Sequence, residues 1–415
     1  MEKKPRRRWT RLTLGLAVVF VTHAVGATLA SGRPTRCVCE GPAWLPAVAT
    51  APAALATDAP PLRVVTYNLH SGLGPRLSFG KPRAEVERNL RAIGAAIVDA
   101  APGHAPDVVG LNEVDFDSRR SAGIDQAAFL ARDLERRTGA PYAVVEGVTW
   151  VRRTRGFEVR YGNAALVRHP VVRAEALAFD DMDTPDLPGV RSGLLLDRLV
   201  REGRGVVKVT IAAPAGEVDV LVTHLDAFAQ AEREAQAAHL LRHVGAGRTT
   251  VLLGDFNAVP TPLTLGRRFF RDDLTHDLLT SGGLADARLV LAARDGLANL
   301  AGWATFPADA PEWPLDGILG SLDLLPARAA VVGTTESDHR GLVVDYHPAG
   351  DLAGPLRSWH DAVRRRQVAH IEGCAEGDDP HAASLAPGAH DQREHRRRRL
   401  LAGSGFADLL GLRGE

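Results

Sequence analysis

Short apolar runs that end at polar residues recur through the middle of the chain. One of them, Val251 to Leu253, leads to Asp255, and Asn257 follows two residues later. Such a run is typical of a buried strand, along which successive side chains point in opposite directions. Asp255 and Asn257 are therefore expected to point the same way, while Phe256 packs on the other side. A strand end closed by an Asx turn would give the same local pattern.

Other apolar runs also lie next to polar groups. These runs are at 62–67, 107–111, 218–223 and 342–344. The polar residues beside them are Asn68, Glu113, His224 and the pair Asp338 and His339. Carboxylate, amide and imidazole groups are the residue types that hold a hard divalent cation and move protons at a phosphate. We therefore expect these strand ends to meet at one site.

Between the apolar runs, other segments have helical periodicity. Val86, Leu90, Ile93 and Ile97 recur at the spacing of one helix face. A second helix is expected through 129–134. The alternation of strands and helices predicts a layered α/β core, although the pattern alone leaves the number of layers open.

A third helix is expected from Ala227 to Val244. It carries His239 and His243, which are four residues apart and would lie on the same face. Metal-binding pairs use this spacing, but no acidic third ligand accompanies these two histidines. We therefore interpret the pair as part of a solvated helix face rather than as a metal site.

The first residues of the chain are typical of an export signal. A basic cluster between Lys3 and Arg8 precedes an apolar stretch from Leu12 to Ala30. This is the layout of a cleaved signal peptide or of an uncleaved signal anchor, and the stretch approaches the ~20 residues that span a bilayer. We expect residues 1–42 to have this role, so that the protein acts outside the cytoplasm, either secreted, periplasmic or anchored in the membrane.

Two further segments are expected to lie outside the folded core. Residues 43–60 are rich in Ala and Pro, which is typical of a tether. Residues 349–415 are rich in His and Arg, which predicts a largely disordered tail or a surface-binding helix rather than part of the core. The arginines at 396–399 could attach this tail to an anionic membrane surface.

The charge balance indicates no general attraction to nucleic acid. The chain has 50 basic and 50 acidic residues, so its formal net charge is zero. An acidic loop from Asp180 to Asp186 would in addition repel a nucleic-acid duplex. The three cysteines all lie outside 61–348, so they do not contribute to chemistry in that region.

Seven short motifs follow one another along residues 61–348. In chain order they are TYNLH at 66–70, LNEVD at 111–115, YGNAAL at 161–166, THLD at 223–226, GDFNAVP at 254–260, LDGIL at 315–319 and SDH at 337–339. The set in this order resembles the endonuclease/exonuclease/phosphatase superfamily of metal-dependent phosphoesterases, which includes deoxyribonucleases, apurinic endonucleases, neutral sphingomyelinases and inositol-polyphosphate phosphatases. The resemblance implies a four-layered α/β sandwich, in which two packed mixed β-sheets are flanked by helices.

The resemblance also implies roles for the polar residues. Glu113 and Asn68 would hold Mg²⁺ or Mn²⁺, and Asp338 could add a further ligand. Asp255 would orient or deprotonate the attacking water, and Asn257 would hold the phosphate or the water.

Two histidines complete the expected catalytic set. His339 and His224 would stabilise the negative charge that develops at the phosphate or protonate the leaving oxygen. Asp316 would orient a catalytic imidazole, but the sequence leaves open which of the two it serves. Asn163 would contact the substrate, as would His70, for which a hydrogen bond within its turn is an equal alternative.

These features predict a metal-dependent phosphoesterase that hydrolyses phosphodiesters outside the cytoplasm. The expected partner is a phosphate-ester substrate, with a phospholipid headgroup or a small phosphodiester preferred to nucleic acid. We expect a monomer that can contact a membrane surface. One alternative is a secreted endonuclease or exonuclease. Another is a non-catalytic surface-binding protein on the same fold, but the complete polar set argues against such a loss of activity.

Overall fold

The computed structural model describes residues 60–75, 80–100, 102–154, 157–179, 202–260, 273–295 and 300–376. The expected leader, nearly all of the tether, the acidic loop and the arginine run lie outside these residues. Within the described ranges, no helix is both long enough and apolar enough to cross a membrane.

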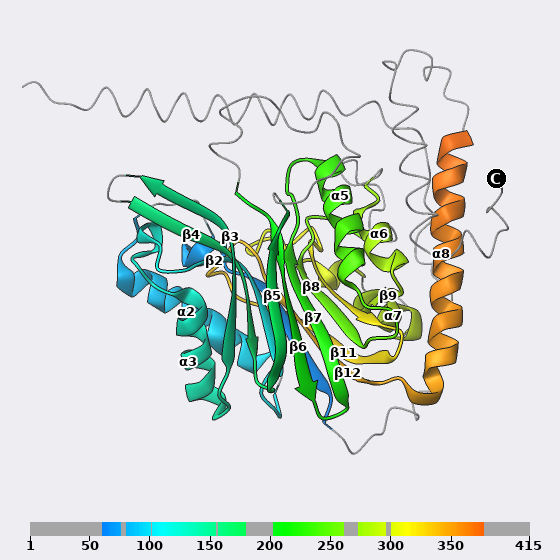
Figure 1. Cartoon of the computed structure of the whole chain (residues 1–415), viewed down its shortest axis with the longest axis horizontal. Coiled ribbons are helices and arrows are strands. Elements are labelled where there is room, and N and C mark those ends of the chain that lie inside the picture. Colours follow the sequence, from blue (N-terminus) through cyan, green and yellow to red (C-terminus); the bar gives the residue numbers. More distant parts are fainter. Residues whose placement is uncertain are drawn as a thin grey trace, which may run out of the picture. The chain divides into compact units, whose positions relative to one another are not determined.

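Two six-stranded mixed β-sheets form the core of the described structure (Figure 1). The strands of the first sheet, in spatial order, are β11 (Leu324–Val332), β12 (Gly341–Pro348), β1 (Leu62–Asn68), β2 (Val108–Asp115), β4 (Phe157–Val167) and β3 (Ala143–Thr154). Those of the second are β5 (Val171–Ala178), β6 (Gly205–Ala213), β7 (Gly216–His224), β8 (Thr250–Asp255), β10 (Asp316–Ser321) and β9 (Leu284–Asp286). In each sheet one inner pair is parallel, β1 with β2 and β7 with β8.

The central strands are buried on both faces. Val64 of β1 belongs to an apolar cluster with Val222 and Leu253 of the second sheet. The next residue, Val65, points the other way and clusters with Ile93 of a covering helix. A strand buried on both faces needs apolar residues at every position, which explains the continuous apolar runs in the sequence.

Helices cover the outer face of each sheet (Figure 1). α2 (Arg83–Asp99) and α3 (Gln126–Thr138) pack on the first sheet, whereas α5 (Gln230–Leu240) and α6 (Thr275–Ser281) pack on the second. The other short helices are α7 (Ala287–Asp295), η3 (His70–Gly72), η4 (Arg119–Ser121), η6 (Leu241–His243), η9 (Leu300–Trp303) and η10 (Gly350–Leu352). The order helix, sheet, sheet, helix confirms the predicted four-layered α/β sandwich.

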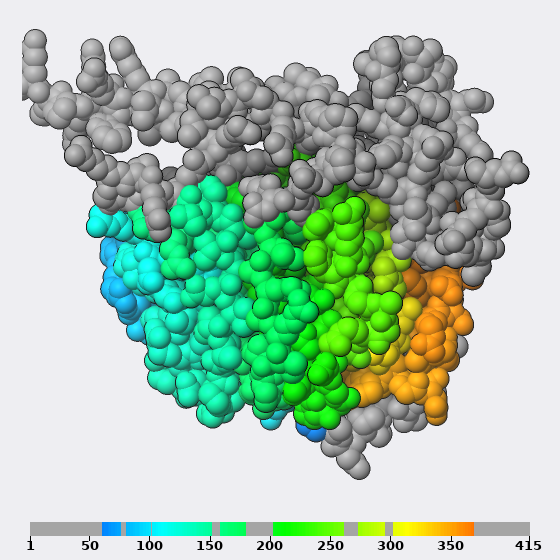
Figure 2. All heavy atoms as spheres, in the orientation of Figure 1, coloured from blue at the N-terminus to red at the C-terminus, as the bar shows by residue number. Residues whose placement is uncertain are grey.

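The segment after β12 differs from the expectation of a disordered tail or a surface-binding helix, because part of it packs on the core. Its first part, Ala353–Glu376, forms the helix α8. Leu356, Trp359 and Val363 of this helix are buried in an apolar cluster. Figure 2 shows α8, in orange, against the yellow-green surface that contains α6 and α7. The apolar stripe is short and lies among histidines and arginines, so the overall composition of the tail concealed it.

Polar contacts add to the packing of α8. Arg364 Nη1 donates to the Asp277 carbonyl oxygen of α6 at 2.6 Å, and Gln367 Nε2 donates to the Asp277 carboxylate, also at 2.6 Å. All three residues are buried. Because buried polar groups without partners are costly, these bonds specify how α8 docks on the core.

Replacing Leu356 with alanine should therefore destabilise the core. The side chain is fully buried, and loss of a buried leucine typically lowers the free energy of unfolding by about 2–5 kcal/mol. Urea unfolding would measure the change. Val172→Ala, at a side chain that is 54% exposed, is the control and should have an effect of at most about 0.5 kcal/mol. Equal stability of the two variants would mean that α8 does not contribute to the core.

Candidate active site

Strand ends from both sheets converge at one edge of the core. The strand registers place Asp255 of β8 directly beside His224 of β7 on one side and Asp316 of β10 on the other. Asn68, at the end of β1, connects the two sheets, because its Nδ2 donates to Asp255 Oδ2 at 3.0 Å and to Glu113 Oε1 at 3.2 Å. The structure thus brings together the polar groups that the sequence placed at separate strand ends.

A β-bulge in β2 presents Glu113 to this edge. The pairing of β2 with β4 shifts register between Leu111 and Val114, and Glu113 has a left-handed backbone with φ of 55°. Bulges re-aim side chains and are frequent beside active sites. Burial, followed by the nearby Glu202 and Asp338 carboxylates, raises the pKa of Glu113 to about 7. A cation bound here would relieve the repulsion between these carboxylates.

Asn112, in the same bulge, supports the site although the sequence did not single it out. Its Nδ2 donates to Asn163 Oδ1 at 2.9 Å and to the Thr223 carbonyl at 2.8 Å. Its Oδ1 accepts from the Asp255 backbone N–H at 2.9 Å. Asn163 in turn donates to the Gly205 carbonyl at 3.0 Å. The predicted substrate contact at Asn163 is therefore an amide already used to join β4 to β2 and to β6 of the other sheet.

Asp255 lies at the centre of the cluster and is almost fully buried. Its Oδ2 is 3.5 Å from both His224 Nε2 and His339 Nε2, and its Oδ1 accepts from the Asn257 backbone N–H at 2.9 Å. Burial raises the pKa of Asp255, and Asp316 adds to this effect, whereas His339 opposes it.

Gly254 allows this carboxylate to reach its position. Its φ is +144°, and a Cβ atom there would lie 1.8 Å from the Thr223 carbonyl oxygen of the neighbouring strand. An L side chain would therefore force β7 and β8 apart immediately before Asp255.

His339 is the histidine that Asp316 orients. The two side chains meet at 2.9 Å between Nδ1 and Oδ2, which resolves the choice that the sequence left open. Burial lowers the pKa of His339, but Asp316 and Asp255 together outweigh it and raise the pKa to about 10. The contact with Asp316 favours the charged ring, with Nδ1 beside Asp316 and Nε2 facing Asp255. Its nearest aromatic contact is Phe306, at 4.8 Å between ring centroids.

His224 is in the opposite environment. Its Nδ1 is 2.9 Å from Arg204 Nη1, and its Nε2 is 3.1 Å from Asn257 Nδ2. Burial lowers the pKa of His224 well below its usual value, and the positive charges of Arg204 and His339 lower it further. Arg204 was not identified from the sequence, because it is a single arginine outside every motif.

His70 and Asp338 lie at the rim of the cluster. His70 Nδ1 is 2.7 Å from the Gly74 carbonyl oxygen, so the turn hydrogen bond considered as one of two alternatives is present. The same ring nitrogen is 3.6 Å from Asp338 Oδ1. The loop that carries Asp338 is tied to β1, because Ser337 Oγ donates to the Asn68 carbonyl oxygen at 2.7 Å.

The donor set fits a hard divalent cation. Glu113, Asn68 and Asp338 remain the predicted ligands, and the Asn68 amide lies 3.2 Å from the Glu113 carboxylate. A second group, formed by Asp255, Asp316 and His339, has ligand atoms within 4.8 Å of one another. Asp316 Oδ1 is buried and has no hydrogen-bond partner among the described residues, so it could accept a hydrogen bond from a bound water.

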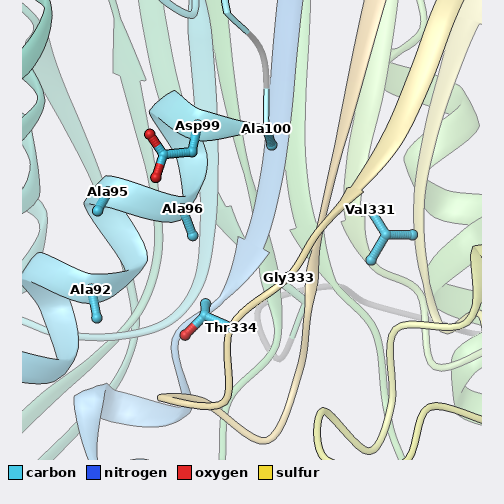
Figure 3. Close-up of a pocket in the computed structure, with 8 residues that line it drawn as sticks. All are labelled: Ala92, Ala95, Ala96, Asp99, Ala100, Val331, Gly333 and Thr334. Carbon is cyan, nitrogen blue, oxygen red and sulfur yellow. The ribbon is translucent and has the colours of Figure 1, made fainter.

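A hollow of about 470 Å³ lies elsewhere and carries no such chemistry (Figure 3). Its lining consists of Ala92, Ala95, Ala96, Asp99, Ala100, Val331, Gly333 and Thr334. None of the residues at the converging strand ends contributes to it, and a single carboxylate among alanines provides neither a ligand set nor a proton-transfer pair. We therefore assign the site to the strand ends.

His239 and His243 should not contribute to catalysis. Their Nε2 atoms are 3.1 Å apart on the outer helix layer, and Phe179 packs on His239. Replacing either with alanine should leave kcat within about 2-fold of wild type, because neither touches the site. Steady-state assays on a generic phosphodiester would measure this. A loss of 10-fold or more would show that the outer helix takes part in the reaction.

Comparison with known proteins identifies the family. The model of the Endonuclease/Exonuclease/phosphatase family matches residues 65–339, and the chain belongs to this family. No curated protein matched the sequence. Among solved structures, an endonuclease/exonuclease/phosphatase from Beutenbergia cavernae is 24% identical with a TM-score of 0.51, over 70% of this chain and 72% of that one. A family protein from Leptotrichia buccalis is 18% identical with a TM-score of 0.47, over 69% and 99%. A mannosyl-6-phosphatase from Bacteroides thetaiotaomicron is 18% identical with a TM-score of 0.46, also over 69% and 99%.

Proposed function

We propose that this protein is a divalent-metal-dependent hydrolase of phosphodiesters. The observation that carries the proposal is the arrangement around Asp255, whose carboxylate lies 3.5 Å from two histidines of opposite charge preference. The carboxylate can orient a water for attack, and an imidazolium beside it can provide the proton for the leaving oxygen. Family membership supports phosphoester hydrolysis as the reaction class.

Each residue then has a defined task. Asp255 orients the attacking water and accepts its proton, and Asn257 positions the phosphate or the water. His339, protonated and held by Asp316, donates a proton to the leaving oxygen or neutralises charge on the phosphate. Glu113 and Asn68, with Asp338, would hold Mg²⁺ or Mn²⁺, which when bound polarises a phosphoryl oxygen.

The substrate is proposed to be a phospholipid headgroup or a small phosphodiester outside the cytoplasm. The basic and apolar leader, the zero net charge and the acidic loop support this choice over duplex nucleic acid. A secreted nuclease is the second candidate, and a monomer in contact with a membrane surface is the expected state. Assays with DNA, sphingomyelin, phosphoinositides and bis-nitrophenyl phosphate, with and without Mg²⁺, would separate these candidates from a non-catalytic binding protein.

A chain lacking residues 1–42 should be soluble, hydrolyse soluble phosphodiesters and degrade plasmid DNA poorly. The reason is that the apolar leader is removed while the described core is kept, and that the acidic loop repels a duplex. Plasmid nicking on agarose gels and release of nitrophenol would measure the two activities. Rapid nicking that disappears in Asp255→Ala would make nucleic acid the substrate and leave the proposed mechanism in place.

A further inference from the structure

His224 is enclosed by hydrogen-bond donors at both ring nitrogens. Arg204 Nη1 is 2.9 Å from Nδ1, and Asn257 Nδ2 is 3.1 Å from Nε2. Both His224 and Arg204 are buried, with 3% and 9% of their surface exposed. A guanidinium group has only donors and keeps its proton at any ordinary pH. The bond between Arg204 and Nδ1 therefore has one direction, with Arg204 donating.

This arrangement determines the charge and the tautomer of His224. An imidazolium would direct an N–H at a donor on each side, so the ring is neutral. Asn257 Nδ2 also donates to the Leu225 carbonyl at 3.1 Å, which sets the orientation of its amide. Of the two donors, the charged guanidinium forms the stronger bond. Nδ1 is therefore the acceptor and Nε2 carries the hydrogen. Asn257 then donates to the Leu225 carbonyl rather than to Nε2, and the acceptor for the Nε2–H is Asp255 Oδ2 at 3.5 Å.

We propose that Arg204 is a positioning residue that holds the neutral Nε2–H tautomer of His224, so that this N–H binds a phosphoryl oxygen of the substrate. The proposal rests on the phosphodiester hydrolysis proposed above. The motifs gave both histidines the same two possible roles, charge stabilisation and proton donation, and the proposal assigns only the first to His224. His224 stabilises charge without transferring a proton, and the role proposed above for His339 is unchanged.

The strand register places Arg204 for this task. Gly205, the first residue of β6, pairs directly with His224 of β7, so the preceding arginine lies beside the imidazole. Arg204 Nη1 also donates to the Tyr161 hydroxyl at 3.3 Å, and its guanidinium is 3.7 Å from a Glu202 carboxylate oxygen. These contacts keep the guanidinium in one orientation.

The two histidines differ because their Nδ1 partners have opposite chemistry. At His339, Asp316 accepts a hydrogen bond, which favours the charged ring. At His224, Arg204 donates a hydrogen bond to Nδ1, which excludes the charged ring. The Nε2 atoms of both rings nevertheless approach the same Asp255 oxygen at 3.5 Å.

Nitrogen-15 NMR of the full chain, with assignment by His224→Asn, tests the tautomer directly. We expect His224 to show a protonated Nε2 and a bare Nδ1 across neutral pH. Arg204→Lys, which can still donate, should keep this pattern, whereas Arg204→Met should give a mixture of tautomers or an imidazolium. A protonated Nδ1 in the wild-type protein, or an unchanged spectrum in folded Arg204→Met, would overturn the proposal.

Kinetics test whether Arg204 acts through His224. Arg204→Met should lower kcat by about 10²-fold with little change in KM, the size typical of losing one charge-stabilising donor. Arg204→Lys should keep most of the wild-type kcat. The double variant with His224→Asn should be no slower than His224→Asn alone. If the losses of kcat in the two single variants multiply in the double variant, the proposal is overturned. Arg364→Met removes an equally buried arginine from α8 and should leave kcat unchanged.

These outcomes separate the proposal from the function on which it rests. An inactive wild-type protein would refute the phosphodiesterase, while the spectrum would still report the tautomer. If Arg204→Met does not fold, the spectra of the wild type and of Arg204→Lys decide, because absence of the Nε2–H pattern in either protein contradicts the proposed role.

Discussion

Phosphodiester hydrolysis should fall by more than about 10³-fold when Asp255 is replaced by asparagine or alanine, because the buried group that accepts the proton of the attacking water is lost. Asparagine has nearly the same shape as aspartate, so Asp255→Asn tests the charge rather than the packing. Glu113→Ala should have a similar effect, because it removes the carboxylate expected to hold the cation. Excess chelator should stop the wild-type enzyme, and added Mg²⁺ or Mn²⁺ should restore it.

Release of nitrophenol from bis-nitrophenyl phosphate measures these losses, and circular dichroism confirms that each variant is folded. Asp351→Ala, at an exposed carboxylate in η10, is a matched control that should retain full activity. Full activity of the wild type in excess chelator would end the metal-dependent mechanism. Full activity of Asp255→Asn would remove that residue from the centre of the reaction.

Loss of the imidazole in His339→Ala should lower kcat by at least about 10²-fold, the size typical of a lost proton donor or charge-stabilising group. Because the pKa of His339 is raised to about 10, the charged ring is present below that pH and is lost above it. The decline of kcat should therefore lie on the alkaline side, far from the usual pKa of histidine.

Asp316→Asn offers a finer test of the same residue. Removing the negative charge should lower the pKa of His339, so the alkaline decline of kcat should move to lower pH. His239→Ala is the control for removing a histidine that does not touch the site. An unchanged profile in Asp316→Asn, or wild-type turnover in His339→Ala, would contradict the assignment of His339 as proton donor.

The strand-end residues could be predicted from sequence because their signal is local. An apolar run that stops at Asp255 or His224 indicates both a buried strand and the place where it ends. Parallel pairing of β7 with β8 then brings the two ends to the same edge. The same pattern predicted a layered α/β core, whereas the four layers were implied by the family resemblance that the seven motifs carry.

Other parts of the site could not be predicted because they depend on the environment of each group. Asp316 and His339 are 23 residues apart, and only the pairing of β8 with β10 and the loop of Ser337 place them at 2.9 Å. Arg204 has no motif around it, and its importance comes from the strand register that sets it beside His224.

The sequence by itself determined that the strands are buried, where they end and which polar groups they present, since these properties follow from the order of apolar and polar side chains. The tertiary structure decided which groups touch and therefore what they do. A histidine has the same sequence signal beside a carboxylate or beside a guanidinium, but its charge follows from that neighbour. For this reason His339 and His224, both next to Asp255, differ only once the fold has given one Asp316 and the other Arg204.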